Sequence, residues 1–562
     1  MGRGAVAANG SAGLALTALA RAVSQQSQRE WAGTPLHEWR IAGPKPTGLA
    51  VQPRDLRAPD PENGRRILGG RWQLAGAILD LGPGGDPWDR ASPSRRFAVL
   101  LHRFGWMADL LALGAAGEAE ALRLTLAWRR LFGRWNAFAW SGEALERRVF
   151  ALACAIRPIS GCANAAQASI LAAELARQAR HLLDLHDGPG RTAERAAAAA
   201  LAGAALSGPA GQSLLDKALA RLTRALPDTV QPDGGHASRT PQAALELLLD
   251  LRCLDAALHE RGMAAPDEMA RAMDRLAGAV RFFTLADGAL PALQGGEALT
   301  AEQVTAAGAS DEARRPIPPS RNGYHRLEGR SLQVIADAAP PATGPWSVSA
   351  CAQPMAVEVL ANGQRLIVGG GWSPEAAAPE AARGLEGAST AALGDADCGL
   401  PLQGLAARLL GPRLVAGVAA VEVARHDDET AVLLEMGHAG FEARYGLTHQ
   451  RRLYLDLADD ALRGEDSFVP TAGADGAGGP VPFQIRFHID PQVRVSMARD
   501  GACVLLRPPG DEFGWRLRYD AAEVAIEPAV HYQDGLPRRS EQVVLRGQVP
   551  AAGARIRWKL TR

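Results

Sequence analysis

The chain has 562 residues, which is too long for a single hydrophobic core, so at least two domains are expected. Its 61 basic and 61 acidic residues cancel, which argues against a nucleic-acid-binding protein with a basic stripe but still permits a local arginine cluster that binds an anionic polymer. Hydrophobic residues make up 47% and charged residues 22% of the chain, as in globular proteins.

Residues 1–90 are expected to form a partly irregular N-terminal extension. Arg3 precedes a short Ala-rich stretch, Ala12–Ala20, which resembles a signal core only weakly because Arg21 follows and no clear cleavage pattern is present. No run of 18 apolar residues occurs, so a membrane-spanning helix is not expected.

From about residue 95 to residue 285, apolar side chains recur at steps of three and four, which predicts helices with one apolar stripe each. Gly and Pro residues separate these segments, and short links between them favour packed antiparallel helix pairs. The predicted helices are 95–113, 143–156, 170–185, 195–206, 214–226, 241–259 and 267–283.

A Pro-rich segment at about 315–322 marks the predicted domain boundary, and beyond it the apolar period falls to two. About a dozen short strands without intervening helices predict a large antiparallel β-sandwich. They include 324–327, 332–335, 355–360, 365–368, 431–435, 450–457, 483–489, 515–519, 538–545 and 554–560. The expected organisation is therefore an extension (1–90), an incomplete α/α toroid (91–318) and a β-sandwich (322–562).

A set of segments, in this order along the chain, resembles the heparinase II/III-like family, a polysaccharide lyase group with an α/α toroid followed by an antiparallel sandwich. They are Phe132–Asn136, Leu175–Leu182, Pro232–Arg239, Gly323–Leu327, His449–Leu455 with Leu462–Asp466, Phe483–Ile489 and Arg538–Gln542. The resemblance implies β-elimination at a uronic acid in an acidic polysaccharide. A base removes the C5 proton while charge on the neighbouring carboxylate is neutralised.

The first candidate site is the segment around Asp233, His236 and Arg239, which precedes a predicted helix with Thr240 as its N-cap. The positive end of such a helix favours an anion. His236 is expected to act as carboxylate neutraliser or base, Arg239 as carboxylate clamp and Asp233 as a substrate-binding residue. In the structural alternative, Asp233 and Arg239 hold the loop and His236 caps it.

Tyr324 opens the first predicted strand and is a further catalytic candidate, with a role in the core as its alternative. His449 and Arg451 share one strand face because they are two residues apart, and together with His438 they are expected to bind a polyanion. The alternative for these three is a solvated face with cross-strand ion pairs.

Trp135 and Asn136 are expected to contact a sugar, because Trp faces suit sugar C–H surfaces and an amide binds hydroxyls. Trp128 and Trp140 flank them, and the alternative is that these Trp residues belong to the toroid core.

Several residues of the family pattern are missing. No Tyr follows the Asp-Gly-Gly turn, where Thr240–Ala244 stand, and Ser347–Gln353 lacks the His that opens the family's sandwich. A later His is replaced within Ser389–Leu393. Three or four metal ligands cannot be assembled from the sequence, and the scattered cysteines, Cys351 among them, show no metal-binding spacing. Neither a metal nor another cofactor is therefore expected.

Two functional hypotheses follow. The first is a lyase that cleaves an acidic polysaccharide by β-elimination; the second is a catalytically impaired glycan-binding or scaffold protein on the same fold. The resemblance implies the cell envelope or periplasm as location, with the cytoplasm as the alternative because no clear signal peptide is present.

Overall fold

The computed structural model describes residues 3–185, 189–308, 316–374, 380–415, 417–471, 479–499 and 501–562. The chain forms two compact units, Met1–Val230 with Glu246–Asp274, and Gln231–Leu245 with Arg275–Arg562. The Pro-rich boundary expected at 315–322 is described from residue 316 onward.

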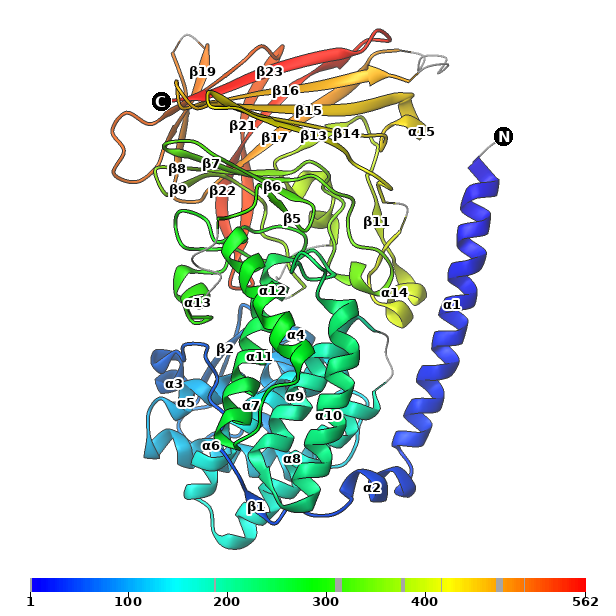
Figure 1. Ribbon diagram of the computed structural model, residues 1–562, viewed down its shortest axis with the longest axis vertical. Coiled ribbons are helices and arrows are strands. Elements are labelled where there is room, and N and C mark those ends of the chain that lie inside the picture. Colours follow the sequence, from blue (N-terminus) through cyan, green and yellow to red (C-terminus); the bar gives the residue numbers. More distant parts are fainter. Residues whose placement is uncertain are drawn as a thin grey trace. The chain divides into compact units, whose positions relative to one another are not determined.

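Most helices gather in the first half of the chain (Figure 1). Their bounds are α1 (Arg3–Ala32), α2 (Pro35–Ala42), α3 (Pro61–Leu68), α4 (Arg95–His102), α5 (Trp106–Leu111), α6 (Ala115–Phe132), α7 (Gly142–Gly161), α8 (Ala165–Asp184), α9 (Thr192–Ala205), α10 (Gly208–Thr229), α11 (Pro241–Glu260) and α12 (Asp267–Phe283). Small pairings also occur, β1 (Gly48–Leu49) with β4 (Leu206–Ser207), and the hairpin β2 (Arg71–Leu74) with β3 (Ala77–Asp80). None of the described helices is both long and apolar enough to cross a bilayer.

The Ala-rich helix α9 shows why this composition folds as it does. It contacts α7, α8 and α10, and its residues from Ala193 to Ala205 are almost all buried. A Cβ at Gly203 would lie 2.6 Å from the backbone nitrogen of Leu215, so the absence of a side chain there permits close approach. Small side chains thus let the helices pack tightly while Ala supports the helical backbone.

The described helices of the first half differ in part from the expected ones. The helix expected over 95–113 is divided into α4 and α5, because Phe104 adopts a positive φ of 61° between them. The N-terminal extension contains the three helices α1 to α3, and α6 forms where no helix was predicted.

The second half contains two antiparallel sheets, as the alternating pattern predicted. The first sheet has nine described strands, with the path β21-β22-β17-β9-β8-β7-β6-β5 and β10 paired to β17. The bounds are β5 (Ser320–Arg321), β6 (Tyr324–Glu328), β7 (Leu332–Asp337), β8 (Val357–Ala361), β9 (Gln364–Val368), β10 (Ala391–Leu393), β17 (Val481–Ile489), β21 (Glu523–Gln533) and β22 (Leu536–Val549). Asn362 and Gly363 both have positive φ, as the two-residue hairpin turn between β8 and β9 requires.

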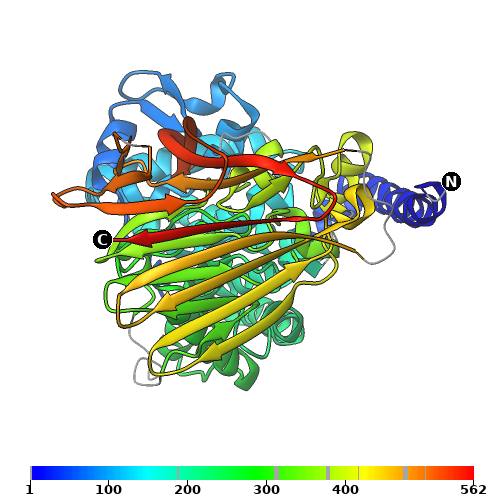
Figure 2. The same ribbon diagram turned by 90° about the horizontal axis from the view of Figure 1, so that it is seen from above.

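The second sheet has eight described strands in the order β13-β14-β15-β16-β23-β20-β19-β18. Their bounds are β13 (Glu422–Asp427), β14 (Ala431–His438), β15 (Leu447–Asp456), β16 (Ala461–Pro470), β18 (Arg494–Met497), β19 (Cys503–Arg507), β20 (Trp515–Tyr519) and β23 (Ala554–Thr561). Figure 2 looks onto this sheet and shows β23, which ends at the C-terminus, lying between the yellow and the orange strands.

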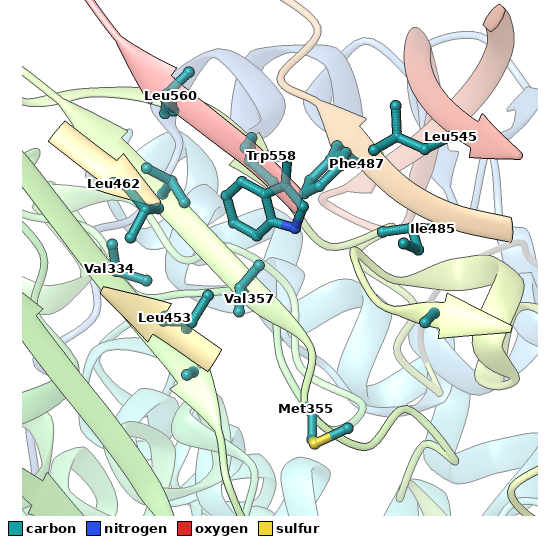
Figure 3. Packing of buried hydrophobic residues seen from close by; sticks show 14 of the residues in the cluster. Val334, Met355, Val357, Leu453, Leu462, Ile485, Phe487, Leu545, Trp558 and Leu560 are labelled. Carbon is teal, nitrogen blue, oxygen red and sulfur yellow. The ribbon is translucent and has the colours of Figure 1, made fainter. Parts of the chain in front are cut away.

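Side chains from both sheets form one apolar core (Figure 3). The rings of Phe487 and Trp558 meet edge to face, with centroids 4.9 Å apart. Trp558 lies directly opposite Gly464 on the neighbouring strand, and a Cβ on that glycine would stand 2.0 Å from the indole. The glycine therefore leaves the space that the indole fills.

Candidate functional site

The turn that carries His236 is built by its own polar groups. Gly234 has a φ of 88°, and the Asp233 carboxylate accepts hydrogen bonds from the backbone N–H of Gly235 at 3.0 Å and of Asn322 at 2.5 Å. Because both carboxylate oxygens bind backbone groups, Asp233 fixes the turn onto the segment before β6. This is the arrangement of the structural alternative.

His236 lies buried in the same turn, and its predicted role in catalysis stays a prediction. Its ring is 2% exposed, and Nδ1 accepts from the backbone N–H of Ser238 at 3.1 Å and lies 2.7 Å from the Ser238 hydroxyl. The ring meets Trp346 edge to face at 5.8 Å. Because Nδ1 is an acceptor, the proton of the neutral ring resides on Nε2.

Arg239 does not lie free to clamp a substrate carboxylate. Its guanidinium pairs with Asp337 at 2.6 Å and donates to four carbonyl oxygens, those of Asn322, Gly323, Ala339 and Pro340. Burial would lower the pKa of this guanidinium, but the charge of Asp337 raises it above its usual value. The expected clamp is thus corrected: Arg239 ties the turn to the first strands of the sandwich.

Tyr324 belongs to the same structural cluster. Its hydroxyl donates to the Arg239 carbonyl at 2.8 Å, its ring lies 4.7 Å below the Arg239 guanidinium, and it is completely buried. Burial raises the pKa of the hydroxyl well above its usual range. A phenol in this state is a poor base, which corrects the catalytic expectation and agrees with the alternative of a core role.

His438, His449 and Arg451 come together, as expected, but inside the sandwich. His449 Nε2 lies 2.8 Å from Asp466 Oδ1, which also accepts from Arg451 Nε at 2.7 Å, and His449 Nδ1 lies 3.4 Å from His438 Nε2. His449 and Arg451 are completely buried and His438 is 5% exposed. Their common face therefore points into the sandwich, where His438 and His449 also border a hollow of about 430 Å³. Binding of a polyanion by these residues stays a prediction.

The hydrogen bonds define the protonation of this buried network. The backbone N–H of Gly440 donates to His438 Nδ1 at 3.0 Å, so His438 carries its proton on Nε2 and His449 donates from Nε2 to Asp466. Burial lowers the pKa of both His438 and His449. Burial alone would raise the pKa of the Asp466 carboxyl, but Arg451 and His449 hold it well below its usual value. The network is thus one anion, one cation and two neutral rings.

Trp135 and Asn136 belong to the other compact unit. The Trp135 backbone N–H donates to Glu38 at 3.1 Å, and the Asn136 side chain accepts from the Ala139 N–H at 2.7 Å, which starts a turn. Both side chains are half-buried, whereas their neighbours Trp128 and Trp140 are each 1% exposed and belong to the core. Sugar contact by Trp135 and Asn136 stays a prediction.

The stretch in which the family pattern implies a His is filled by other interactions. Burial raises the pKa of the Cys351 thiol to about 12. The Gln353 amide donates to the carbonyls of Ala382 and Gly384, and Arg383 donates to the carbonyl of Ala350. Within the described part of the chain, no group of three His, Cys, Asp or Glu side chains is placed to hold a metal ion.

Two polar features of the sandwich were not predicted as a site. Asp466 is the acceptor around which the buried network forms, and Trp558 also donates to it at 3.0 Å. A row of basic residues on the outer face of the second sheet lines a hollow of about 440 Å³. The alternation of basic residues in Arg555-Ile556-Arg557-Trp558-Lys559 was the signal that could have indicated it.

Comparison with known proteins places these observations in a family. A family model described as the C-terminal part of heparinase II/III-like proteins matches residues 319–559. FtsZ-localized protein C of Caulobacter vibrioides (strain NA1000 / CB15N) is 50% identical over 542 residues, which cover 95% of this chain and 94% of that protein.

Solved structures give the same result for the fold. A crystal structure of heparinase III covers 95% of this chain and 89% of its own, with a TM-score of 0.69 and 14% identity. The heparan sulfate lyase HepC from Pedobacter heparinus covers 96% of this chain and 89% of its own, with a TM-score of 0.54 and 12% identity. At these identities the likeness concerns the toroid and sandwich architecture alone.

Proposed function

Because this chain belongs to the heparinase II/III-like family, we propose that it is a binding or scaffold protein on a polysaccharide-lyase fold, and that it localises with FtsZ. The location follows the name of the relative that is 50% identical over 542 residues. According to this proposal, the chain is the catalytically impaired alternative, and it acts where FtsZ is found.

The observation that carries the proposal is the state of Tyr324 and Arg239. The tyrosine has a raised pKa and donates to a backbone carbonyl, and the arginine is neutralised by Asp337. β-Elimination needs a base that accepts the C5 proton and a positive group that stabilises the developing dianion. Both side chains are committed to the fold, and His236 Nδ1 also accepts a hydrogen bond within its own turn, from the backbone N–H of Ser238.

A polysaccharide-cleaving activity is the second candidate, and the likeness of the whole fold to heparinase III favours it. In that case His236 would have to act as the base, with carboxylate neutralisation supplied by groups other than Arg239. An acidic polysaccharide remains the substrate class that this candidate implies.

Two measurements separate the candidates. Full-length protein and its His236→Ala variant are incubated with a panel of uronate-containing polysaccharides while the absorbance of an unsaturated uronate is followed. We expect no increase for either protein. An increase that His236→Ala abolishes would establish the lyase and overturn the proposal.

The location is measured separately in Caulobacter vibrioides cells that lack FtsZ-localized protein C and carry labelled FtsZ. A fluorescent fusion of this chain is expected to coincide with FtsZ, and the His236→Ala fusion should do so equally well. A fusion that is folded but spread evenly through the cell would contradict the shared location.

A further inference from the structure

The outer face of the second sheet carries three basic residues directly opposite one another on adjacent strands. Arg463 on β16 pairs in register with Lys559 on β23, which pairs with Arg518 on β20. Adjacent strands lie about 4.8 Å apart, so the three side chains, here called the outer basic row, start close together. Figure 2 looks onto the sheet that carries them.

The outer basic row is incompletely neutralised. Arg463 pairs with Asp456 at 3.0 Å, whereas Lys559 and Arg518 have no ion pair with any residue that the structure describes. Like charges directly opposite on a sheet repel. Of the three residues, only Arg463 is therefore neutralised by a described carboxylate.

The next row along the same strands shows the usual solution. Glu435, Arg452, Glu465 and Arg557 stand opposite one another on β14, β15, β16 and β23, with charges that alternate. Arg452 pairs with Glu435 at 2.6 Å, and Glu465 is 3.4 Å from Arg557. The contrast shows that an unneutralised row is not a general property of this face.

The outer basic row borders a hollow with an apolar floor. Leu433 and Tyr454 continue the row across β14 and β15, and the Arg463 guanidinium lies 5.5 Å from the Tyr454 ring. The hollow measures about 440 Å³ and also touches the carboxylate-bearing residues Glu465 and Asp520. The hollow therefore has a hydrophobic centre and a predominantly basic rim.

We propose that this hollow binds a short polypeptide segment in which acidic side chains flank an apolar one. The apolar side chain would cover Leu433 and Tyr454, and the acidic ones would neutralise Lys559 and Arg518. The apolar side chain of the peptide would lose its contact with water, and this burial supplies affinity. The charged rim would orient the peptide and speed its association.

A peptide fits this surface better than a uronate polymer does. Leu433 offers an aliphatic surface that a hydroxylated sugar ring does not match, and Glu465 and Asp520 would repel a chain with a carboxylate on every repeat. A peptide can place its acids opposite Lys559 and Arg518 alone. The inference does not depend on FtsZ, since any protein could supply such a segment, and it concerns a surface formed by β14, β15, β16, β20 and β23.

The test uses full-length protein and an array of short synthetic peptides, each with a central Leu or Phe between Asp or Glu residues. Matched peptides carry Lys in place of the acids or Ala in place of the apolar residue. The strongest acidic–apolar peptide is then titrated by fluorescence anisotropy against wild-type protein, the double variant Lys559→Glu/Arg518→Glu, and the control Arg539→Glu. Arg539 is an exposed residue of β22 in the other sheet.

We expect saturable binding that needs both the acids and the apolar residue and that weakens at high ionic strength. Two reversed rim charges should weaken it about tenfold or more, whereas the control should bind like wild type. If circular dichroism shows that the double variant is misfolded, Lys559→Gln is titrated instead, and a smaller loss in the same direction is expected.

Three results would overturn the proposal. The first is an array in which binding does not depend on the acids and the apolar residue together. The second is a control variant that loses as much affinity as the double variant. The third is a uronate oligosaccharide that binds this face when the peptides do not. None of these results bears on the location with FtsZ, so the two proposals fail independently.

Discussion

Replacement of Asp466 by Asn tests whether the buried polar network holds the sandwich together. The carboxylate accepts from His449 and Arg451 through Oδ1 and from Trp558 through Oδ2, and all four side chains are at most 2% exposed. The asparagine amide has the shape of the carboxylate, but its NH2 group is a donor where the carboxylate has an acceptor oxygen. At least one N–H of the three partners would therefore face an N–H of the amide. It also leaves the Arg451 charge without a carboxylate.

The expected loss follows from these contacts. Removing one partner of a buried ion pair costs about 3–5 kcal/mol, because the remaining charge stays buried. The matched control is Asp456→Asn, which removes the charge next to the half-exposed Arg463 and should cost less than about 1 kcal/mol. Hydrogen exchange of peptides from β15, β16 and β23, measured in full-length protein with increasing urea, gives the free energy of opening for the sandwich. A loss in Asp466→Asn no larger than that of the control would refute the structural role of the network.

Three more predictions address other buried groups. Arg239→Ala leaves the Asp337 carboxylate buried without its cation, so hydrogen exchange around β7 should show a loss of about 3–5 kcal/mol; an unchanged rate would return Arg239 to the role of a substrate clamp. Gly464→Ala places a methyl group against the Trp558 indole and should cost about 1–3 kcal/mol, seen as a lower midpoint of thermal unfolding, and an unchanged midpoint would contradict the packing. The pKa of His102 is lowered to about 3 by burial, so the unfolded chain takes up a proton below about pH 6.5 while the folded chain does not. The free energy of unfolding should therefore fall by about 1.4 kcal/mol for each pH unit below that point, down toward the folded pKa. In urea unfolding at several pH values, His102→Gln should remove this part of the pH dependence. An equal pH dependence in the variant would disprove the prediction.

Local periodicity predicted much of the secondary structure because the apolar stripe of a helix or strand is written in neighbouring residues. The helix over 267–283 and the strand over 515–519 match α12 and β20. Strand β16 was not predicted, because its inward positions include Gly464 and Asp466, which break the apolar alternation. Both residues suit the core only because of their neighbours: His449 and Arg451 on β15 bind Asp466, and Trp558 on β23 fills the space beside Gly464.

The same reason explains the errors at the candidate site. A spacing of two correctly indicated that His449 and Arg451 share a face, but a polar pair was expected to face solvent. The carboxylate that permits their burial is Asp466, fifteen residues beyond Arg451 and on another strand. Likewise, the sequence placed Arg239 next to a helix start, whereas Asp337, nearly a hundred residues later, occupies its guanidinium.

The distribution of paired and unpaired charge relates these findings to function. In this sandwich, Arg239 and Arg451 are each neutralised by a buried carboxylate, so neither offers its charge to a ligand. Lys559 and Arg518 lie instead on the outer face, where neither forms an ion pair with a described residue. A lyase concentrates unsatisfied positive charge where a substrate carboxylate binds. Lys559 and Arg518 instead border a hollow with an apolar floor on the outer face of the second sheet, which is the arrangement expected of a surface that binds another polypeptide.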